Sequence, residues 1–176
     1  MTGPGGGLHR LVLLRHAKAE PGGATDDVLR PLALVGRKHA GNVGTALVAD
    51  GLVPDLVLCS PAVRTRQTWE LASSRLGDVD PEVRTVDALY PAGVAELMQV
   101  VHGLDARART VLVVGHEPTM AATAEHLAGT GSDTSAVAQV RVGVPTATYS
   151  VLESDASWQA WEPRGARLVR VHRPPR

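Results

Sequence analysis

Two arginines and two histidines stand where short apolar segments of the sequence end. Arg15 and His16 follow the first such segment, His116 follows another, and Arg64 lies just after a third. If these segments are parallel strands, their carboxyl ends meet at one edge of a sheet, which is where open α/β sheets bind ligands. Arginines and histidines gathered there would repel one another unless an anion lay between them, and a phosphoryl group is the natural occupant.

This combination of side chains predicts phosphoryl transfer with a histidine nucleophile. Neutral imidazole is a good nucleophile near pH 7, and positive neighbours disfavour its protonation, so a nitrogen of His16 stays free to react. Arg15 and Arg64 would stabilise the charge on the equatorial phosphoryl oxygens, where most catalysis of phosphoryl transfer arises. The scheme requires no metal and no other cofactor.

The elements that would position these residues alternate along the chain. Continuous apolar runs predict buried strands, and apolar residues at helical spacing predict the helices between them. The predicted strands are 11–14, 56–59, 83–86 and 110–114, with strands near a sheet edge over 139–144, 147–152 and 168–172. The predicted helices are 34–48, 61–76, 94–104 and 118–127, and the polar loops are 18–30 and 129–135. In the second helix we expect Ser60 as the N-cap and Pro61 at the first helical position.

The alternation predicts an α/β fold with a mainly parallel sheet. The 176 residues suffice for one domain with its own core. We expect this domain over residues 8–173, after a glycine-rich flexible tail at 1–7.

Four short segments carry a resemblance to a known family. Leu-Leu-Arg-His-Ala-Lys-Ala at 13–19 resembles the Arg-His-Gly signature of the histidine phosphatase superfamily. Ser-Pro-Ala-Val-Arg-Thr-Arg-Gln-Thr at 60–68 is similar to the family's Ser-Pro-x-x-Arg-x-x-Gln-Thr segment, and Val-Gly-His-Glu-Pro at 114–118 resembles its Gly-His segment. Arg-Pro-Leu-x-x-x-Gly at 30–36 resembles a segment of the small SixA-like phosphohistidine phosphatases. Their order and spacing agree over about residues 10–130.

The resemblance implies a fold and a set of roles. The family fold is a mixed, mostly parallel sheet flanked by helices, of the phosphoglycerate mutase-like kind. His16 would take the phosphoryl group and form a phosphohistidine, Arg15 and Arg64 would clamp the phosphate, and His116 would complete the pocket. Further candidates for substrate contact are Lys18, Arg30 and Glu117.

The sequence departs from the family pattern at two places. Ala17 replaces the usual glycine, as it often does in SixA-like members. Many family members carry a glutamate after the third strand as general acid, but the corresponding segment here, 87–91, is Asp-Ala-Leu-Tyr-Pro. Asp87, Glu117 and Asp27 are the alternatives. Imidazole leaves readily once it is protonated, so a missing acid favours a phosphohistidine substrate over a phosphate ester.

We therefore expect SixA-like dephosphorylation of phosphohistidine on a protein, such as a phosphorelay or phosphotransfer component. A chain of this length has little room for the lid of a mutase. The alternatives are a small-molecule phosphomonoesterase with the same core, acting on a small phosphate ester, and a non-catalytic phosphate-binding module.

Composition narrows the partners and the location. Lys and Arg total 18, and Asp and Glu also total 18, so no broad field favours nucleic acid or a membrane. Cys59 is the only cysteine, which excludes an intramolecular disulfide and a cysteine-rich zinc site, and its spacing to the arginines does not fit a cysteine phosphatase loop. No apolar run reaches the roughly 18 residues of a membrane span, and the start does not resemble a signal peptide, so we expect a cytoplasmic protein.

Overall fold

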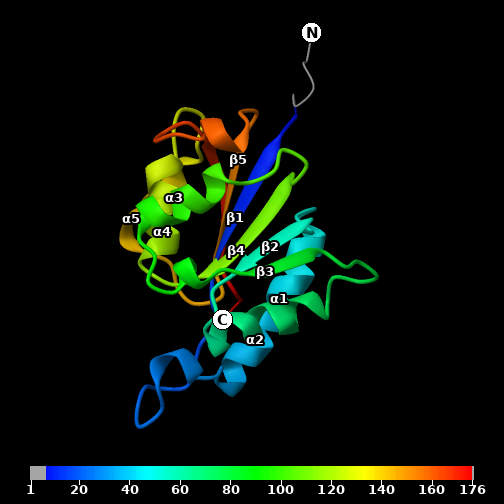
Figure 1. Cartoon of the computed structure of the whole chain (residues 1–176), viewed down its shortest axis with the longest axis vertical. Coiled ribbons are helices and arrows are strands. Elements are labelled where there is room, and N and C mark those ends of the chain that lie inside the picture. Colours follow the sequence, from blue (N-terminus) through cyan, green and yellow to red (C-terminus); the bar gives the residue numbers. More distant parts are fainter. Residues whose placement is uncertain (1–6, 176) are drawn as a thin grey trace.

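The computed structural model describes residues 7–175. Almost all of the predicted flexible tail, residues 1–6, lies outside the described residues. The fold is α/β, as the sequence predicts (Figure 1). No helix within residues 7–175 has the length and apolar character needed to cross a membrane.

Six strands form one mixed sheet in the order β3-β2-β4-β1-β5-β6. Strands β1, β4, β2 and β3 are parallel, whereas β5 runs antiparallel to both β1 and β6. Their bounds are β1 His9–Arg15, β2 Leu56–Cys59, β3 Glu82–Thr85, β4 Thr110–Gly115, β5 Tyr149–Ser154 and β6 Arg167–His172. The central strands β1, β2 and β4 are almost wholly buried, because helices cover both faces of the sheet.

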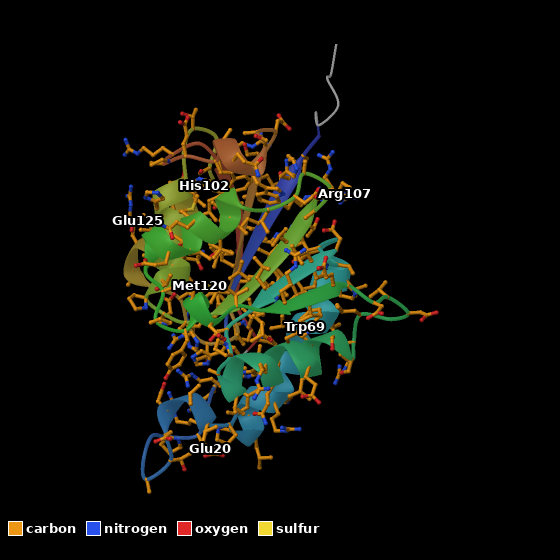
Figure 2. All side chains as sticks on the ribbon, viewed as in Figure 1. Glu20, Trp69, His102, Arg107, Met120 and Glu125 are labelled. Atoms are coloured by element: carbon orange, nitrogen blue, oxygen red, sulfur yellow. The ribbon has the colours of Figure 1, made fainter. Side chains whose placement is uncertain are left out.

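Helices pack on both faces of this sheet, α1 and α2 on one and α3, α4 and α5 on the other (Figure 1). Their bounds are α1 Leu34–Ala49, α2 Val63–Ser73, α3 Val94–His102, α4 Thr119–Leu127 and α5 Thr134–Val142, with short 3₁₀ turns at Asp27–Leu29, Asp87–Leu89 and Trp158–Ala160. Each face has its own core of leucine, valine and alanine, with Trp69 on the α2 side and Met120 on the α4 side (Figure 2).

The carboxyl ends of the three central strands meet at one edge of the sheet. Arg15 at the end of β1 pairs with Gly115 at the end of β4, and Cys59 at the end of β2 pairs with Val114. The backbone N–H of His16 then donates to the carbonyl of Gly115 at 3.0 Å. The loop that carries Glu20 lies below this edge, at the lower end of the molecule (Figures 1 and 2). The register therefore brings the predicted strand ends together.

Helix α2 begins later than the sequence predicts. Its first residue is Val63 and its N-cap is Ala62, so the predicted cap at Ser60 and first position at Pro61 are wrong. The hydroxyl of Ser60 instead lies 2.7 Å from Nε2 of His116. The same hydroxyl also accepts the N–H of Ala62 at 3.4 Å, one residue before the helix begins. The helix also ends at Ser73, three residues before the predicted end at 76.

The strand predicted over 139–144 is wrong, because most of this segment lies in helix α5. The carboxylate of Asp133 caps the helix by accepting the N–H of Ala136 at 2.8 Å. Ala136 and Val140, one turn apart, are the residues that α5 buries. Gly143, with a φ of 103°, follows the last helical residue. An N-cap aspartate and a closing glycine are helix signals that outweighed the apolar alternation. The other strands and helices form where the sequence predicts them, within a few residues.

Candidate active site

His16 is held in one tautomer at the end of β1. Its Nδ1 lies 2.7 Å from the carbonyl oxygen of Ala17. Because a carbonyl only accepts hydrogen bonds, Nδ1 carries the hydrogen and Nε2 keeps its lone pair. The side chain is 8% exposed. Burial lowers the pKa of His16 to about 4, the hydrogen bond to Ala17 opposes this, and the nearby arginines lower it further. His16 is therefore neutral near pH 7, with Nε2 free as a nucleophile.

Arg64 divides its hydrogen bonds between two edges of its guanidinium. On the outer edge, Nη1 donates to the carbonyl oxygen of Asp27 at 2.8 Å and Nη2 donates to its Oδ2 at 3.0 Å. On the inner edge, Nη2 makes only a long 3.4 Å contact with Nδ1 of His116, and Nε is buried without a partner. The edge formed by Nε and Nη2 is the one that binds an oxyanion side-on with two parallel hydrogen bonds. Arg64 is therefore anchored at one edge, whereas at the other its Nε is free and its Nη2 holds only the long contact with His116.

His116 faces His16 across the site. The centroids of the two rings are 5.3 Å apart. Nδ1 of His116 accepts from Arg64, so Nε2 carries the hydrogen and donates to the hydroxyl of Ser60. Burial lowers the pKa of His116 to about 4, and the charge of Arg64 lowers it further. Both histidines are thus neutral at physiological pH, and burial, more than the cationic neighbours considered in the sequence analysis, is the main cause.

Arg15 is fixed by the chain that follows α5. Its Nη1 donates to the carbonyl of Val144 at 2.7 Å, and its Nε is buried without a partner. Glu117 does not point a free carboxylate at the site. Its Oε1 accepts the N–H of Ala121 at 2.8 Å and its Oε2 accepts that of Val144 at 3.1 Å. Glu117 therefore ties α4 to the segment that holds Arg15, and its charge offsets part of the effect of burial, which lowers the pKa of Arg15.

Three buried arginine Nε groups lack a hydrogen-bond partner within the part of the chain that the structure describes. They belong to Arg15, Arg30 and Arg64. A buried N–H donor without an acceptor costs roughly 1–3 kcal/mol, more when it is charged. An oxyanion would satisfy such donors and neutralise their charge. The arrangement is suited to binding a phosphoryl group beside His16.

Asp27 organises the outer side of the site. Its carboxylate accepts hydrogen bonds from Tyr90, Arg30 and Arg64. These three donors hold the pKa of Asp27 well below its usual range, with the largest effect from the Tyr90 hydroxyl. Tyr90 in turn places its ring edge-on to His116, with centroids 5.5 Å apart. Asp27 is therefore an ionised carboxylate and does not supply a proton near pH 7.

The three acid candidates lie in different surroundings. Asp27 is ionised, and both oxygens of Glu117 accept backbone N–H groups. Asp87 begins a 3₁₀ turn and is exposed, without a side-chain hydrogen bond to the other described residues.

The remaining motif residues position the site. Thr68 donates its hydroxyl to the carbonyl of Arg64 at 2.7 Å and accepts the N–H of Ala17 at 3.0 Å. Gln67 accepts the N–H of Leu32 at 2.8 Å. These contacts join α2 to the loop after β1. Gly36 lets α1 approach the same loop closely, because a Cβ at this position would lie 1.9 Å from the carbonyl oxygen of Lys18.

The structure separates the weaker candidates of the sequence analysis. Arg30 lies at the site, where it donates to Asp27 at 3.0 Å and lowers the pKa of both histidines. The side chain of Lys18 is exposed, and among residues 7–175 it makes no hydrogen bond or ion pair. Sequence reasoning missed Tyr90 and the contact of Ser60 with His116. In the sequence, the only indications of these contacts were the presence of a tyrosine within 87–91 and of a serine before Pro61.

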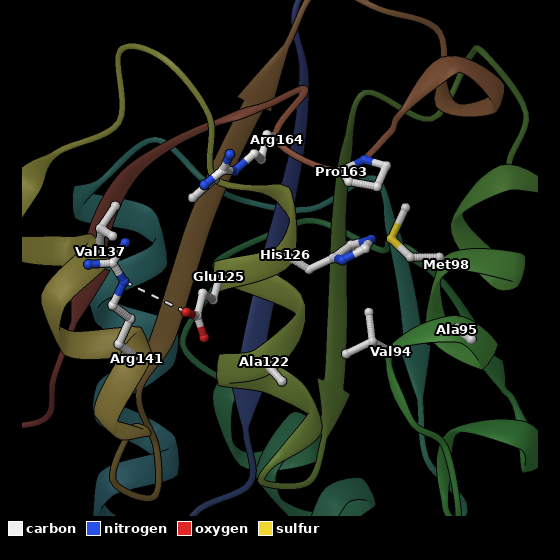
Figure 3. Close-up of a pocket in the computed structure, with 11 residues that line it drawn as sticks. Val94, Ala95, Met98, Ala122, Glu125, His126, Val137, Arg141, Pro163 and Arg164 are labelled. Atoms are coloured by element: carbon white, nitrogen blue, oxygen red, sulfur yellow. Dashed lines mark ion pairs between the residues drawn. The ribbon is translucent and has the colours of Figure 1, made fainter.

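A separate hollow of about 760 Å³ lies between α3, α4 and the segment around Pro163 (Figure 3). Val94, Met98 and Ala122 give it apolar walls, and Glu125 and Arg141 pair at 3.7 Å beside it. Its lining includes neither the histidines nor the arginines described above. Arg164 and His126 also line it, but unlike the arginines beside His16 none of its lining residues has a buried side-chain N–H group without a hydrogen-bond partner.

Comparisons with known proteins identify relatives along the whole chain. No model of a known protein family matches it. An uncharacterised protein of Mycobacterium tuberculosis is 38% identical over 163 residues, which cover 92% of this chain and 99% of the relative. A solved structure from Nakamurella multipartitia, proposed to be the phosphohistidine phosphatase SixA, is 35% identical with a TM-score of 0.82 and covers 96% of this chain and 97% of its own.

A second solved structure, a proposed SixA from Agrobacterium tumefaciens, is 28% identical with a TM-score of 0.78 and covers 94% of this chain and 98% of its own. Both resemblances extend over nearly the full length of each protein, so they include the loop after β1 as well as the sheet. The chain therefore belongs to the histidine phosphatase superfamily, with its phosphoglycerate mutase-like fold, and is a phosphatase similar to the SixA phosphohistidine phosphatases.

Proposed function

We propose that this protein removes the phosphoryl group from phosphohistidine on a protein, by a metal-independent route through a phosphohistidine at His16. The observation that carries the proposal is the neutral His16, with Nε2 free, beside arginine Nε groups that have no partner. Such donors supply positive charge where the phosphoryl oxygens gain negative charge in the transition state. The arginines thereby take the part that a metal ion plays in other phosphatases.

In the first step, Nε2 of His16 attacks the phosphorus atom. The bond between phosphorus and the substrate's imidazole nitrogen breaks, and its electron pair stays on that nitrogen. The His16 ring becomes a phosphorylated imidazolium, with the hydrogen of Nδ1 directed at the Ala17 carbonyl. Arg15 and Arg64 hold the phosphoryl oxygens during transfer, and His116 lies on the opposite side of the pocket.

In the second step, water attacks the phosphorus atom of phospho-His16. The bond to Nε2 breaks and its electron pair returns to the ring, which is again neutral with its hydrogen on Nδ1. Both hydrogens of the water remain on the released phosphate. The carbonyl of Ala17 assists because it stabilises the positive ring, and a positive imidazole is a better leaving group than a neutral one.

The electrostatics of the site favour phosphohistidine over an ester. An alkoxide needs a proton from a general acid as it leaves. Asp27 is ionised, both side-chain oxygens of Glu117 accept backbone N–H groups, and Asp87 is exposed without a side-chain hydrogen bond to the other described residues. A phosphohistidine that already carries a proton on its second ring nitrogen leaves as neutral imidazole. The two SixA-type relatives support the same substrate class.

The test compares a protein phosphorylated on histidine with para-nitrophenyl phosphate, without added metal. We expect a kcat/KM at least about tenfold higher on phosphohistidine, and no turnover by His16→Ala. Arg66→Gln is the matched control, because Arg66 is exposed on α2 two residues beyond Arg64. A higher kcat/KM on the ester would indicate a phosphomonoesterase instead. Failure of the unaltered protein to cleave either substrate would indicate a phosphate-binding module.

A further inference from the structure

The carboxylate of Asp27 has one hydrogen-bond position left over. A carboxylate offers about four acceptor sites, two on each oxygen. Oδ2 accepts from Nη2 of Arg64 at 3.0 Å and from the hydroxyl of Tyr90. Oδ1 accepts only from Nη2 of Arg30, at 3.0 Å. The side chain is 53% exposed, so the free position on Oδ1 is open to a molecule that enters from solvent.

This carboxylate stands next to the edge of Arg64 that is free for phosphate. Nη2 of Arg64 contacts both Oδ2 of Asp27 and Nδ1 of His116, so it lies between the exposed carboxylate and the half-buried histidine. His16 is 8% exposed and lies on the inner side. A phosphoryl group bound between Arg64 and His16 therefore directs its leaving group outward, on the side where Asp27 lies, because the attacking and leaving atoms are in line.

We propose that Asp27 recognises the imidazole of the substrate, with Oδ1 accepting the N–H of the ring nitrogen that carries no phosphoryl group. The inference rests on the proposed function and adds a specificity-determining residue to it. Each of the two imidazoles in the site then donates its free N–H group to an oxygen atom of the protein. The carbonyl of Ala17 accepts from the inner ring, that of His16, and the carboxylate of Asp27 accepts from the outer ring, that of the substrate.

The contact has a chemical consequence for the first step. With its second ring nitrogen protonated, the substrate is a phosphorylated imidazolium. When the N–P bond breaks, the electron pair goes to the nitrogen that held phosphorus, and the ring leaves as neutral imidazole still bonded to Asp27. A negative carboxylate stabilises the protonated ring, so it raises the fraction of substrate in the reactive form at neutral pH. No separate acid is consumed.

The experiment compares Asp27→Asn with the unaltered protein on two substrates. One is a short histidine peptide phosphorylated on its imidazole, and the other is phosphoramidate, which has an N–P bond but no second ring nitrogen. In the variant, the amide oxygen has to stay at the Oδ2 position to accept from Arg64 and Tyr90. Its NH₂ group then occupies the Oδ1 position and offers a donor where the substrate also has a donor.

We expect kcat/KM on the phosphohistidine peptide to fall at least about tenfold further than kcat/KM on phosphoramidate, the size expected for one charge-assisted hydrogen bond. Any weakening of the hold on Arg64 lowers both values alike and cancels in the ratio. Asp26→Asn is the matched control, since Asp26 is an adjacent exposed carboxylate without a side-chain capping bond. It should leave the ratio unchanged.

Equal losses on both substrates would overturn the inference, because Asp27 would then act only through Arg64, while the proposed function would stand. A second measurement is the pH profile on the peptide. The decline of kcat at high pH should begin at lower pH in Asp27→Asn, because the carboxylate stabilises the protonated ring only in the bound complex, and an unshifted profile would also count against the contact. If the unaltered protein cleaves neither substrate, the proposed function fails and the inference fails with it.

Discussion

Lowering the pH from 7.5 to 5.0 should destabilise the fold, because the native state keeps buried imidazoles neutral. The pKa of His16 in the folded protein is about 4, below the 6.5 of an ordinary histidine. Between these two values the unfolded chain binds a proton at this residue and the folded chain does not. The free energy of unfolding therefore falls as the pH decreases from 6.5 toward 4, and it is fully recovered above 6.5.

The magnitude follows from the two pKa values. At pH 5.0, an imidazole that titrates near 4 when folded and near 6.5 when unfolded lowers the free energy of unfolding by about 2 kcal/mol. His116 also has a pKa of about 4 in the folded protein, but it is more exposed, so solvent reduces its contribution. The lowered pKa of Asp27 acts at more acid pH, below the ordinary value of 3.8, and leaves this window unaffected.

The assay is urea unfolding at several pH values between 5.0 and 7.5, for the unaltered protein and for His16→Gln. A glutamine keeps a donor for the Ala17 carbonyl but does not titrate. We expect the loss of stability on acidification to shrink by about 2 kcal/mol in the variant. If both proteins lose the same free energy between pH 7.5 and 5.0, His16 does not have the depressed pKa, and the argument for a neutral nucleophile fails.

Three further substitutions test the geometry around this histidine. Gly36→Ala places a Cβ 1.9 Å from the Lys18 carbonyl oxygen, so urea unfolding should show a loss of roughly 1–3 kcal/mol. Gly22→Ala, with no atom within 4 Å, should stay within about 0.5 kcal/mol, and equal effects would contradict the close approach. In Arg64→Lys, the single ammonium group cannot hold Asp27 and bind a phosphate side-on at the same time, so kcat/KM on a phosphohistidine peptide should fall about 100-fold or more. An unchanged kcat/KM would contradict the assignment of one edge of Arg64 to Asp27 and the other to phosphate. Thr68→Val removes the hydroxyl that bonds to both Arg64 and Ala17. The free energy of unfolding should fall by about 1–3 kcal/mol, and kcat/KM should fall as well. If neither changes, Thr68 does not position Arg64.

The grouping of the site residues was predictable because it depends on strand ends. Continuous apolar runs indicate buried parallel strands, and the ends of such strands meet at one edge. Arg15, His16 and His116 follow β1 and β4 directly, so the topology alone places them together. Arg64 lies in the first turn of α2, close enough to the end of β2 for the same argument to hold.

The outer side of the site was not predictable from the same pattern. Asp27 and Arg64 are 37 residues apart in the chain, and Tyr90 and Asp27 are 63 apart. Asp27 begins a short 3₁₀ turn and Tyr90 follows another, and both turns lie within irregular connecting segments. A loop has no hydrophobic period that fixes where its side chains point. The apolar residues at every second position around Val140 likewise predicted a strand. The helix signal there, the N-cap Asp133, lies seven residues before Val140 and outside the alternating segment.

The most direct test of the account is to find the phosphoryl group on the enzyme. The protein is mixed with a histidine-phosphorylated protein carrying labelled phosphate, stopped within one turnover in alkali, and mapped by mass spectrometry, beside His16→Ala. The account predicts an acid-labile phosphoryl group on His16 that appears before free phosphate, and neither signal in the variant. Release of phosphate by His16→Ala at the unaltered rate, or a phosphoryl group on another residue, would contradict it.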